Sequence, residues 1–423
     1  MIPIRKVEEK QQSQHRLLVL LLVFPVLFLV FSMFVKSNEL TWFEGMLGIF
    51  TSPGTLLTDF FEVGGIRAAF TNAAVMGGVT LYLFKRYQVR IGGLSIAAFF
   101  TVLGFSFFGK NPLNIFPIFI GGVIYCRYQK IEIRDVLLVL LFSTGLSPIV
   151  SQIMFAGIFK PGIAFALGMA IGILIGFIIV PISSHMLRFH DGFNLYNLGF
   201  TAGIIGTIFT SIMRSFRIEI EPVFLVYQKN HVVMILFMIC LLVYLILIGL
   251  QINPKAIQNY RGILRFPGRT VTDFPRLVGY GVTFVNMGVM GLLSVIYVVL
   301  VDGIFNGPVL AAIFTVVGFS AFGKHPKNSF SVVLGVWIAA VFFGYDLQST
   351  GMILAVLFST TIAPIAGTYG PIAGVIAGML HLALVTNIGG VHGGINLYNN
   401  GFSGGLVAGF FVPIIDAFKK GGR

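Results

Sequence analysis

The chain contains the stretch FTVLGFSFFGKNP at residues 100–112, and a nearly identical stretch, FTVVGFSAFGKHP, follows at residues 314–326. A second pair comes later in each copy, with HDGFNLYNLGF at residues 190–200 and HGGINLYNNGF at residues 392–402. Several shorter matches keep the same order around these two pairs. Matches in a constant order indicate an internal duplication, so we interpret the chain as two copies of one unit.

The composition indicates that both copies lie in a membrane. Of the 423 residues, 57% are hydrophobic and only 10% are charged, whereas a soluble domain is typically about 25% charged. Too few charged side chains remain to cover a water-facing surface, which excludes a soluble enzyme, a disordered chain and a disulfide scaffold. We therefore expect an all-α polytopic membrane protein whose main partner is the lipid bilayer.

Each copy contains six apolar segments, and a leading helix and a linking helix lie outside the copies. If every segment crosses the membrane, seven crossings separate a position in the first copy from the equivalent position in the second. Because seven is odd, equivalent positions lie on opposite sides, and we expect two six-segment repeats of inverted topology. Segments two and three of each copy are close to the minimum spanning length, so they form either two short crossings or a re-entrant hairpin. The predicted parts are the N-terminus with the leading helix, repeat unit 1, the linking helix with a basic loop, repeat unit 2 and a tail, at residues 1–55, 56–215, 216–269, 270–418 and 419–423.

The charges test this inversion independently. The first copy has basic loops after its first and third segments, whereas the equivalent loops of the second copy, around Asp302 and Asp346, contain neither Lys nor Arg. Opposite charge bias in matching loops is what the positive-inside rule requires of two oppositely oriented copies. We therefore expect a multi-pass protein with both termini in the cytoplasm. The net charge of +13 follows these loops and forms no basic face for a nucleic-acid partner.

Each copy places a lysine in a Gly-Lys-x-Pro turn, Lys110 in the first and Lys324 in the second, and Asn114 and Asn328 follow. A loop lysine that extends to the membrane surface is the simpler interpretation. However, the residue is Lys in both copies although inversion puts the turns on opposite faces. If the turns lie near the midplane, two ammonium groups and two helix N-termini would converge there and favour an anion. These four side chains are therefore candidate solute-binding groups.

The second repeated motif places polar side chains before or within the apolar final segment of each copy. Helix capping by Asn and interfacial anchoring by Tyr explain part of it. Two asparagines per copy are more than a helix cap needs. Polar side chains inside a membrane span are costly unless they face a cavity or hydrogen-bond to backbone groups where a helix is interrupted. We predict that they line a solute pathway. The candidates are His190, Asn194, Tyr196, Asn197, His392, Asn396, Tyr398 and Asn399.

Hydroxyl side chains precede a proline in the fourth segment of each copy, namely Ser143, Thr144, Ser359 and Thr360. The simpler interpretation is that they satisfy carbonyl groups freed by the proline. A weaker alternative is that they coordinate a coupling ion, H⁺ or Na⁺. No metal site or other cofactor is expected, because no histidine of the repeated motif has a partner at ligand spacing.

At the paired Gly-Phe-Ser-x-Phe-Gly-Lys-x-Pro and Asn-Leu-Tyr-Asn-x-Gly-Phe motifs, the sequence resembles a family of bacterial integral membrane proteins known as a domain of unknown function. The resemblance covers nearly the whole chain and implies a location in the bacterial cytoplasmic (inner) membrane, without implying a substrate. At the level of the fold alone, the inverted duplication is also similar to urea-transporter and secondary-transporter architectures.

These observations predict a secondary transporter or channel that moves a small polar solute, with an anion favoured, through a site between the two repeats. The alternatives are a channel for a small neutral solute such as urea or ammonia, an intramembrane enzyme, and a scaffold. No enzyme is predicted, because the Gly-x-Ser-x-Gly pattern at residues 401–405 lacks the preceding strand that a nucleophile elbow needs. A further copy of the same chain, in a homo-oligomer, is a possible partner.

Overall fold

The structure is a computed structural model that describes residues 13–35, 40–220 and 223–420. The prediction of cytoplasmic termini concerns residues 1–12 and 421–423, which lie outside this part of the chain. The regular elements of the described residues are helices, and β pairing is limited to isolated bridges. Nine of the described helices are long and apolar enough to cross a membrane. The predicted all-α membrane fold is confirmed.

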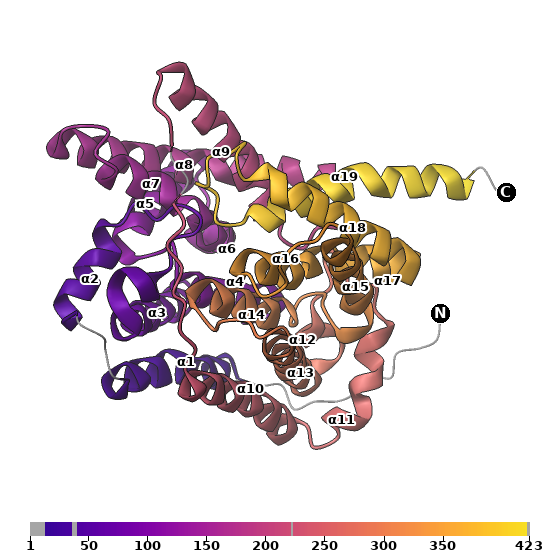
Figure 1. Cartoon of the computed structure of the whole chain (residues 1–423). Helices are drawn as coiled ribbons and strands as arrows, with labels where there is room; N and C mark the ends of the chain where they lie inside the picture. The colour runs from indigo at the N-terminus through magenta and orange to yellow at the C-terminus, as the bar shows by residue number, and fades with distance from the viewer. Residues whose placement is uncertain (1–12, 36–39, 221–222, 421–423) are drawn as a thin grey trace.

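Two series of helices with the same order make up the molecule, and Figure 1 shows them in indigo to magenta and in orange to yellow. The first series contains α2 (Trp42–Thr51), α3 (Phe60–Arg86), α4 (Gly93–Phe105), α5 (Pro112–Gln129), α6 (Ile133–Ser143), η1 (Thr144–Leu146), α7 (Ser147–Phe155), α8 (Pro161–Phe189) and α9 (Asn197–Ser215). The second contains α11 (Ala256–Asn259), η2 (Tyr260–Arg265), α12 (Phe274–Leu277), α13 (Gly279–Leu300), α14 (Gly307–Phe319), α15 (Pro326–Phe342), α16 (Thr350–Ser359), η3 (Thr360–Ile362), α17 (Ala363–Tyr369), α18 (Pro371–Ile388) and α19 (Asn399–Lys420).

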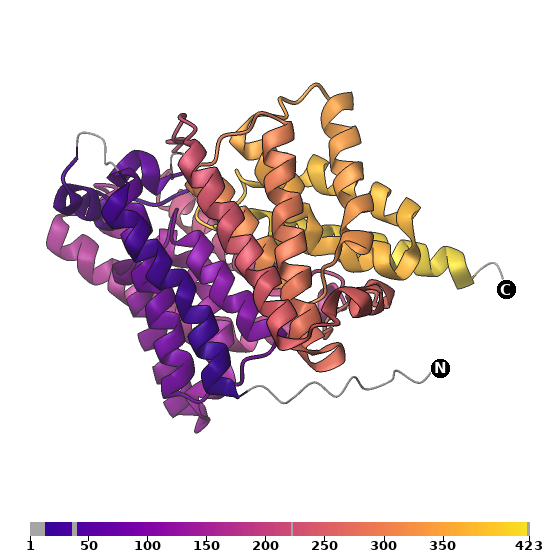
Figure 2. The same cartoon turned by 90° about the horizontal axis from the view of Figure 1, so that it is seen from below.

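The leading helix α1 (Gln14–Phe34) and the linking helix α10 (Val232–Ile252) occupy equivalent positions. Pro25 of α1 lies against Gly77 of α3, and Leu242 of α10 lies against Gly291 of α13. Figure 2 shows α1, α10 and α13 as neighbouring slanted helices in indigo, crimson and orange. Each helix therefore packs on the first long helix of its repeat, so the structure adds one equivalent helix to each six-segment unit.

Segments two and three of each repeat form a hairpin whose tip is the Gly-Lys turn. Helices α4 and α14 have 13 residues each, and a rise of 1.5 Å per residue makes them about 20 Å long, which is less than the ~30 Å hydrocarbon core. The tips are covered by the chain that precedes each repeat, because Gly54 lies against Gly109 and Gly268 against Gly323. The hairpins thus end inside the protein, as expected for interrupted or re-entrant segments.

The two repeats meet along α4 and α14, which pack antiparallel. Gly104 of α4 lies against Ala311 of α14, and the equivalent contact joins Gly318 with Ala97; a Cβ atom at either glycine would lie only 3.0 or 3.1 Å from the alanine Cα. Gly104 and Gly318 are equivalent residues of the two repeats, and so are Ala97 and Ala311. The two contacts are therefore related by a pseudo-two-fold axis that is perpendicular to both helices. The repeats are therefore inverted relative to each other.

Two carboxylates cap the ends of this antiparallel pair. The Asp59 side chain accepts a hydrogen bond from the Gly307 N–H at the start of α14 (3.2 Å), and that of Asp273 accepts one from the Gly93 N–H at the start of α4 (3.1 Å). A carboxylate at a helix N-terminus satisfies free N–H groups and complements the helix dipole. Because each cap comes from the other repeat, the caps fix the register of α4 against α14.

Candidate functional site

The two lysines of the Gly-Lys turns are buried and bonded across the repeat boundary. Lys110 and Lys324 have no exposed surface. The Lys110 ammonium donates a hydrogen bond to the Tyr398 hydroxyl, and the Lys324 ammonium donates to the Tyr196 hydroxyl and to Thr360 (2.7 Å). Each lysine thus meets the tyrosine of the Asn-Leu-Tyr-Asn motif in the other repeat. Neither extends to the surface.

The predicted convergence of the two ammonium groups is wrong. Lys110 follows the end of α4 and Lys324 follows the end of α14, and these helices run antiparallel. The turns therefore lie at opposite ends of the pair, which are separated by roughly the ~20 Å length of one helix. The lysines instead form two separate Lys–Tyr pairs related by the pseudo-two-fold axis.

A buried asparagine from the first long helix of each repeat fixes the lysine turn. The Asn72 amide donates to the carbonyl groups of Ser106 and Lys110 (2.7 and 2.8 Å). The Asn286 amide makes the equivalent bonds in the second repeat, both at 2.7 Å. The sequence analysis did not select these two residues as site residues. Their signal was the same polar residue, asparagine, at equivalent positions of two apolar segments.

Asn114 and Asn328 close the turns from the other side. The Asn114 amide donates to the Gly109 carbonyl and to the Ser151 hydroxyl, both at 2.9 Å. The Asn328 amide donates to the Gly323 carbonyl (2.8 Å). The two glycines have positive φ angles of 80° and 100°, a conformation that favours glycine. The asparagines therefore hold the backbone that presents each lysine.

The Asn-Leu-Tyr-Asn motifs form the non-helical entries to α9 and α19, and they cross between repeats. The Asn194 amide donates to the Gly401 carbonyl (2.9 Å), and the Asn396 amide donates to the Gly199 carbonyl (3.3 Å). Gly199 and Gly401 lie against each other without space for a side chain. These four residues therefore join α9 and α19 at the pseudo-two-fold axis.

The remaining residues of the motif bond within their own repeat. His190 lies 2.9 Å from the Asn197 side-chain oxygen, and His392 lies 2.9 Å from that of Asn399. The two asparagine amides donate in turn to carbonyl groups at the end of α8 and in α18, at 3.1 and 3.2 Å. Each histidine thus orients the asparagine that begins the following helix.

The hydroxyl residues of the fourth segments lie where η1 and η3 interrupt the helices. Each donates to the carbonyl group three residues earlier, at 2.6 to 2.7 Å, and the residues are Ser143, Thr144, Ser359 and Thr360. Thr360 additionally accepts a hydrogen bond from Lys324. Within the described residues, His, Cys, Asp and Glu form no group of three that could hold a metal ion. Coordination of a coupling ion by these hydroxyls stays a prediction.

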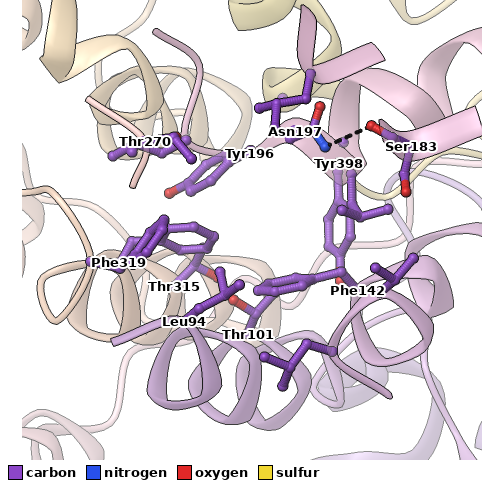
Figure 3. Close-up of a pocket in the computed structure, with 18 of the residues that line it drawn as sticks. Leu94, Thr101, Phe142, Ser183, Tyr196, Asn197, Thr270, Thr315, Phe319 and Tyr398 are labelled. Atoms are coloured by element: carbon purple, nitrogen blue, oxygen red, sulfur yellow. Dashed lines mark hydrogen bonds between the residues drawn. The ribbon is translucent and has the colours of Figure 1, made fainter. Parts of the chain in front are cut away.

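A cavity of about 330 Å³ lies between the repeats, beside both Lys–Tyr pairs. We call it the Thr270 cavity, after one of the residues that line it. Figure 3 shows Thr101 and Thr315 on its floor, with Tyr196 and Phe319 on one side and Tyr398 and Phe142 on the other. Its lining is mainly aromatic and aliphatic, and the lysines lie behind the tyrosines and not in the wall.

A second cavity of about 640 Å³, which we call the Leu56 cavity, occupies the equivalent position in the inverted arrangement. Val139 lines the Thr270 cavity and its counterpart Ala355 lines the Leu56 cavity, and the lining residues Thr270 and Leu56 are themselves equivalent. The two cavities share wall residues, namely Leu397, Phe358 and Asn400. The cavities therefore approach the same layer from opposite ends of the α4–α14 pair.

The floor of the Thr270 cavity carries a hydroxyl group that no protein atom satisfies. Thr101 is 2% exposed, and its Oγ1 has no hydrogen-bond partner in the described part of the chain. The equivalent Thr315 Oγ1 donates to the Ala311 carbonyl (2.7 Å). A buried hydroxyl without a partner costs free energy, and because the Thr101 oxygen is buried from the cavity as well, the two equivalent threonines differ in this internal hydrogen bond.

Comparison with known proteins identifies a family. No curated protein and no solved structure matches the chain. A family model, described as a protein of unknown function (DUF1576), matches residues 38–215 and again residues 233–417. The two matches coincide with the two inverted repeats and together cover most of the sequence. The chain therefore belongs to the DUF1576 family of proteins of unknown function.

Proposed function

We propose that the protein transports a small polar solute across a membrane, through the interface between its two inverted repeats. The observation that carries this proposal is the pair of equivalent cavities, which open at opposite ends of the α4–α14 pair and share a wall around Leu397. Two related cavities that meet at one layer are the arrangement that alternating access requires, in which one repeat moves against the other.

The arrangement favours a transporter over an open channel or an enzyme. The cavities are separate voids with common wall residues, so a solute passes only if the layer between them opens toward each side in turn. The polar groups around this layer occur in both repeats, whereas a catalytic site would need one asymmetric set. We place the protein in a bacterial cytoplasmic membrane, with the basic loops and both termini in the cytoplasm. H⁺ or Na⁺ coupling and a homo-oligomer belong to this proposal.

Thiol labelling tests the pathway without knowledge of the solute. In a protein whose Cys126 and Cys240 are replaced by Ala, we expect Leu397→Cys to react with a membrane-impermeant maleimide from both faces of sealed vesicles. Leu397 is 3% exposed and lines both cavities, so each conformation opens it to one side. Mass spectrometry of vesicles of each orientation measures the labelled fraction.

The control is Leu137→Cys, because Leu137 is fully buried in the core and lines neither cavity. It should stay unlabelled from both faces. Labelling of Leu397→Cys from one face only would indicate a binding pocket without a pathway. Labelling from neither face would indicate a scaffold, and either result contradicts transport.

A further inference from the structure

We infer that the Leu56 cavity binds the solute as a small oxyanion, through the guanidinium group of Arg214 and the side-chain amide of Asn400. This inference rests on the proposed transport function and names the chemistry of its solute. Three side chains that line this cavity, Arg214, Tyr345 and Asn400, keep N–H or O–H groups without a hydrogen-bond partner in the described part of the chain. All three can donate, and a set of donors favours a negatively charged oxygen.

Arg214 supplies a positive charge that no carboxylate of the described residues neutralises. It lies in the last turn of α9, and its guanidinium group donates a hydrogen bond across the repeat boundary to the Gly390 carbonyl (2.8 Å). This bond holds the guanidinium group at the cavity and leaves its other N–H groups free. The ion pairs in the described part of the chain involve Arg134 and Arg269 instead. A planar guanidinium group with free N–H groups matches two oxygens of a carboxylate or phosphate group.

Asn400 places a second donor in the wall that the two cavities share. Its side-chain oxygen lies 3.1 Å from Nε2 of His381, and Nδ1 of the same ring lies 3.3 Å from the Ser403 hydroxyl. Because an amide oxygen can only accept, Nε2 carries the proton of this contact. The Asn400 amide nitrogen has no partner among the described residues and keeps accessible surface. The side chain is therefore held by its oxygen, with its N–H groups free for a solute.

The first repeat shows that the fold does not require this polar chain. Leu198 occupies the position equivalent to Asn400. Ile179 occupies that of His381, and α9 nevertheless begins at the same point of its repeat as α19. His381 and Ser403 are fully buried and line neither cavity, so they position Asn400 and offer a solute no nucleophile. Buried polar side chains are costly in a membrane protein, so a chain present in one repeat only indicates a binding role for Asn400.

Binding to the purified full-length protein in lipid nanodiscs tests this inference. Isothermal titration calorimetry would compare three oxyanions, namely acetate, succinate and inorganic phosphate, with neutral acetamide. We expect at least one oxyanion to bind about tenfold or more tightly than acetamide, because only an oxyanion compensates the charge of Arg214. The three probes also distinguish a carboxylate from a phosphate as the bound group. Equally tight binding of acetamide, or no binding of any of the three oxyanions, would overturn the inference.

Variants of Arg214 locate the bound charge. Arg214→Gln keeps a hydrogen-bonding side chain and removes the charge, so the affinity for the oxyanion should fall about tenfold or more. Arg214→Lys keeps the charge and should retain part of the affinity. Arg217→Gln is the matched control, because Arg217 follows the end of α9, is exposed and lines neither cavity. It should bind like the wild type. Wild-type affinity in Arg214→Gln would contradict the site.

A double variant tests the role of Asn400. Asn400→Leu combined with His381→Ile gives the second repeat the residues of the first, so the protein should fold with an unfolding temperature close to that of the wild type. Its oxyanion affinity should fall about tenfold or more, because a hydrogen bond to a charged group is lost. Asn387→Leu, on the exposed side of α18, should leave affinity unchanged. Wild-type affinity in the double variant would contradict the role of Asn400.

The labelling of Leu397→Cys separates this inference from the transport function on which it rests. If Leu397→Cys is labelled from both faces while no oxyanion binds, transport stands and the solute class falls. If an oxyanion binds in a manner that depends on Arg214 while Leu397→Cys is labelled from one face only, the site stands and transport falls.

Discussion

Asn286→Ala is expected to lower the unfolding temperature of the protein by more than any other single polar replacement near the lysine turns. Asn286 has no exposed surface, and its amide donates to the carbonyl groups of Ser320 and Lys324, while its oxygen accepts from the Tyr260 hydroxyl (3.0 Å). The alanine leaves these three groups without a partner. The carbonyl groups of Ser320 and Lys324 belong to fully buried residues, and each buried polar group without a partner costs about 1–3 kcal/mol, so the free energy of unfolding should fall by at least ~2 kcal/mol.

Two further asparagines make this prediction specific. Asn72→Ala should have a smaller effect, because the Asn72 amide makes the equivalent two bonds but its oxygen has no hydrogen-bond partner within the described residues. Asn387 is exposed on α18, and Asn387→Ala should leave the unfolding temperature nearly unchanged. Thermal unfolding of the detergent-solubilised protein, followed by thiol-reactive dye fluorescence, measures all three. Equal unfolding temperatures for the Asn286 and Asn387 variants would show that the turn does not depend on this network.

The second large effect is expected for the lysines. Lys110→Met and Lys324→Met keep an unbranched side chain that is one atom shorter and remove the buried charge, and each takes the lysine donor from a tyrosine hydroxyl. If the solute is an anion, its uptake should fall about tenfold or more in each variant, because charge interactions are strong where little water is present. Uptake of a series of radiolabelled small anions at pH 8 by proteoliposomes, corrected for protein-free vesicles, measures this loss.

An exposed lysine provides the matched control. Lys160 lies at the start of α8 and is exposed, so Lys160→Met changes the net charge by the same amount without touching the cavities. It should transport like the wild type. Unchanged uptake in both buried-lysine variants would remove the anion from the proposal, and a protein that transports urea instead would be a channel or carrier for neutral solutes.

The sequence was sufficient to predict the architecture, because the duplication is visible in the residues themselves. The paired motifs and the opposite charge bias of matching loops require two inverted copies, and α4 and α14 do pack antiparallel. The sequence predicts α10 as a linking helix between the two repeats and does not relate it to α1. Its equivalence lies in packing, since both helices cover the first long helix of a repeat.

The partners of the site could not be predicted in the same way. Lys110 and Tyr398 are 288 positions apart, and their contact depends on how the inverted repeats interlock. Sequence spacing indicated that lysines and tyrosines belong to one region, but not that each lysine takes the tyrosine of the other repeat.

The inverted arrangement of the two cavities is tested most directly by the equivalent pair Val139→Cys and Ala355→Cys, each in the protein without native cysteines. Val139 lines the Thr270 cavity and Ala355 lines the Leu56 cavity. In sealed vesicles of known orientation, a membrane-impermeant maleimide should label Val139→Cys predominantly from one face and Ala355→Cys predominantly from the opposite face. Predominant labelling of both cysteines from the same face would contradict the inverted repeats and the transport pathway built on them.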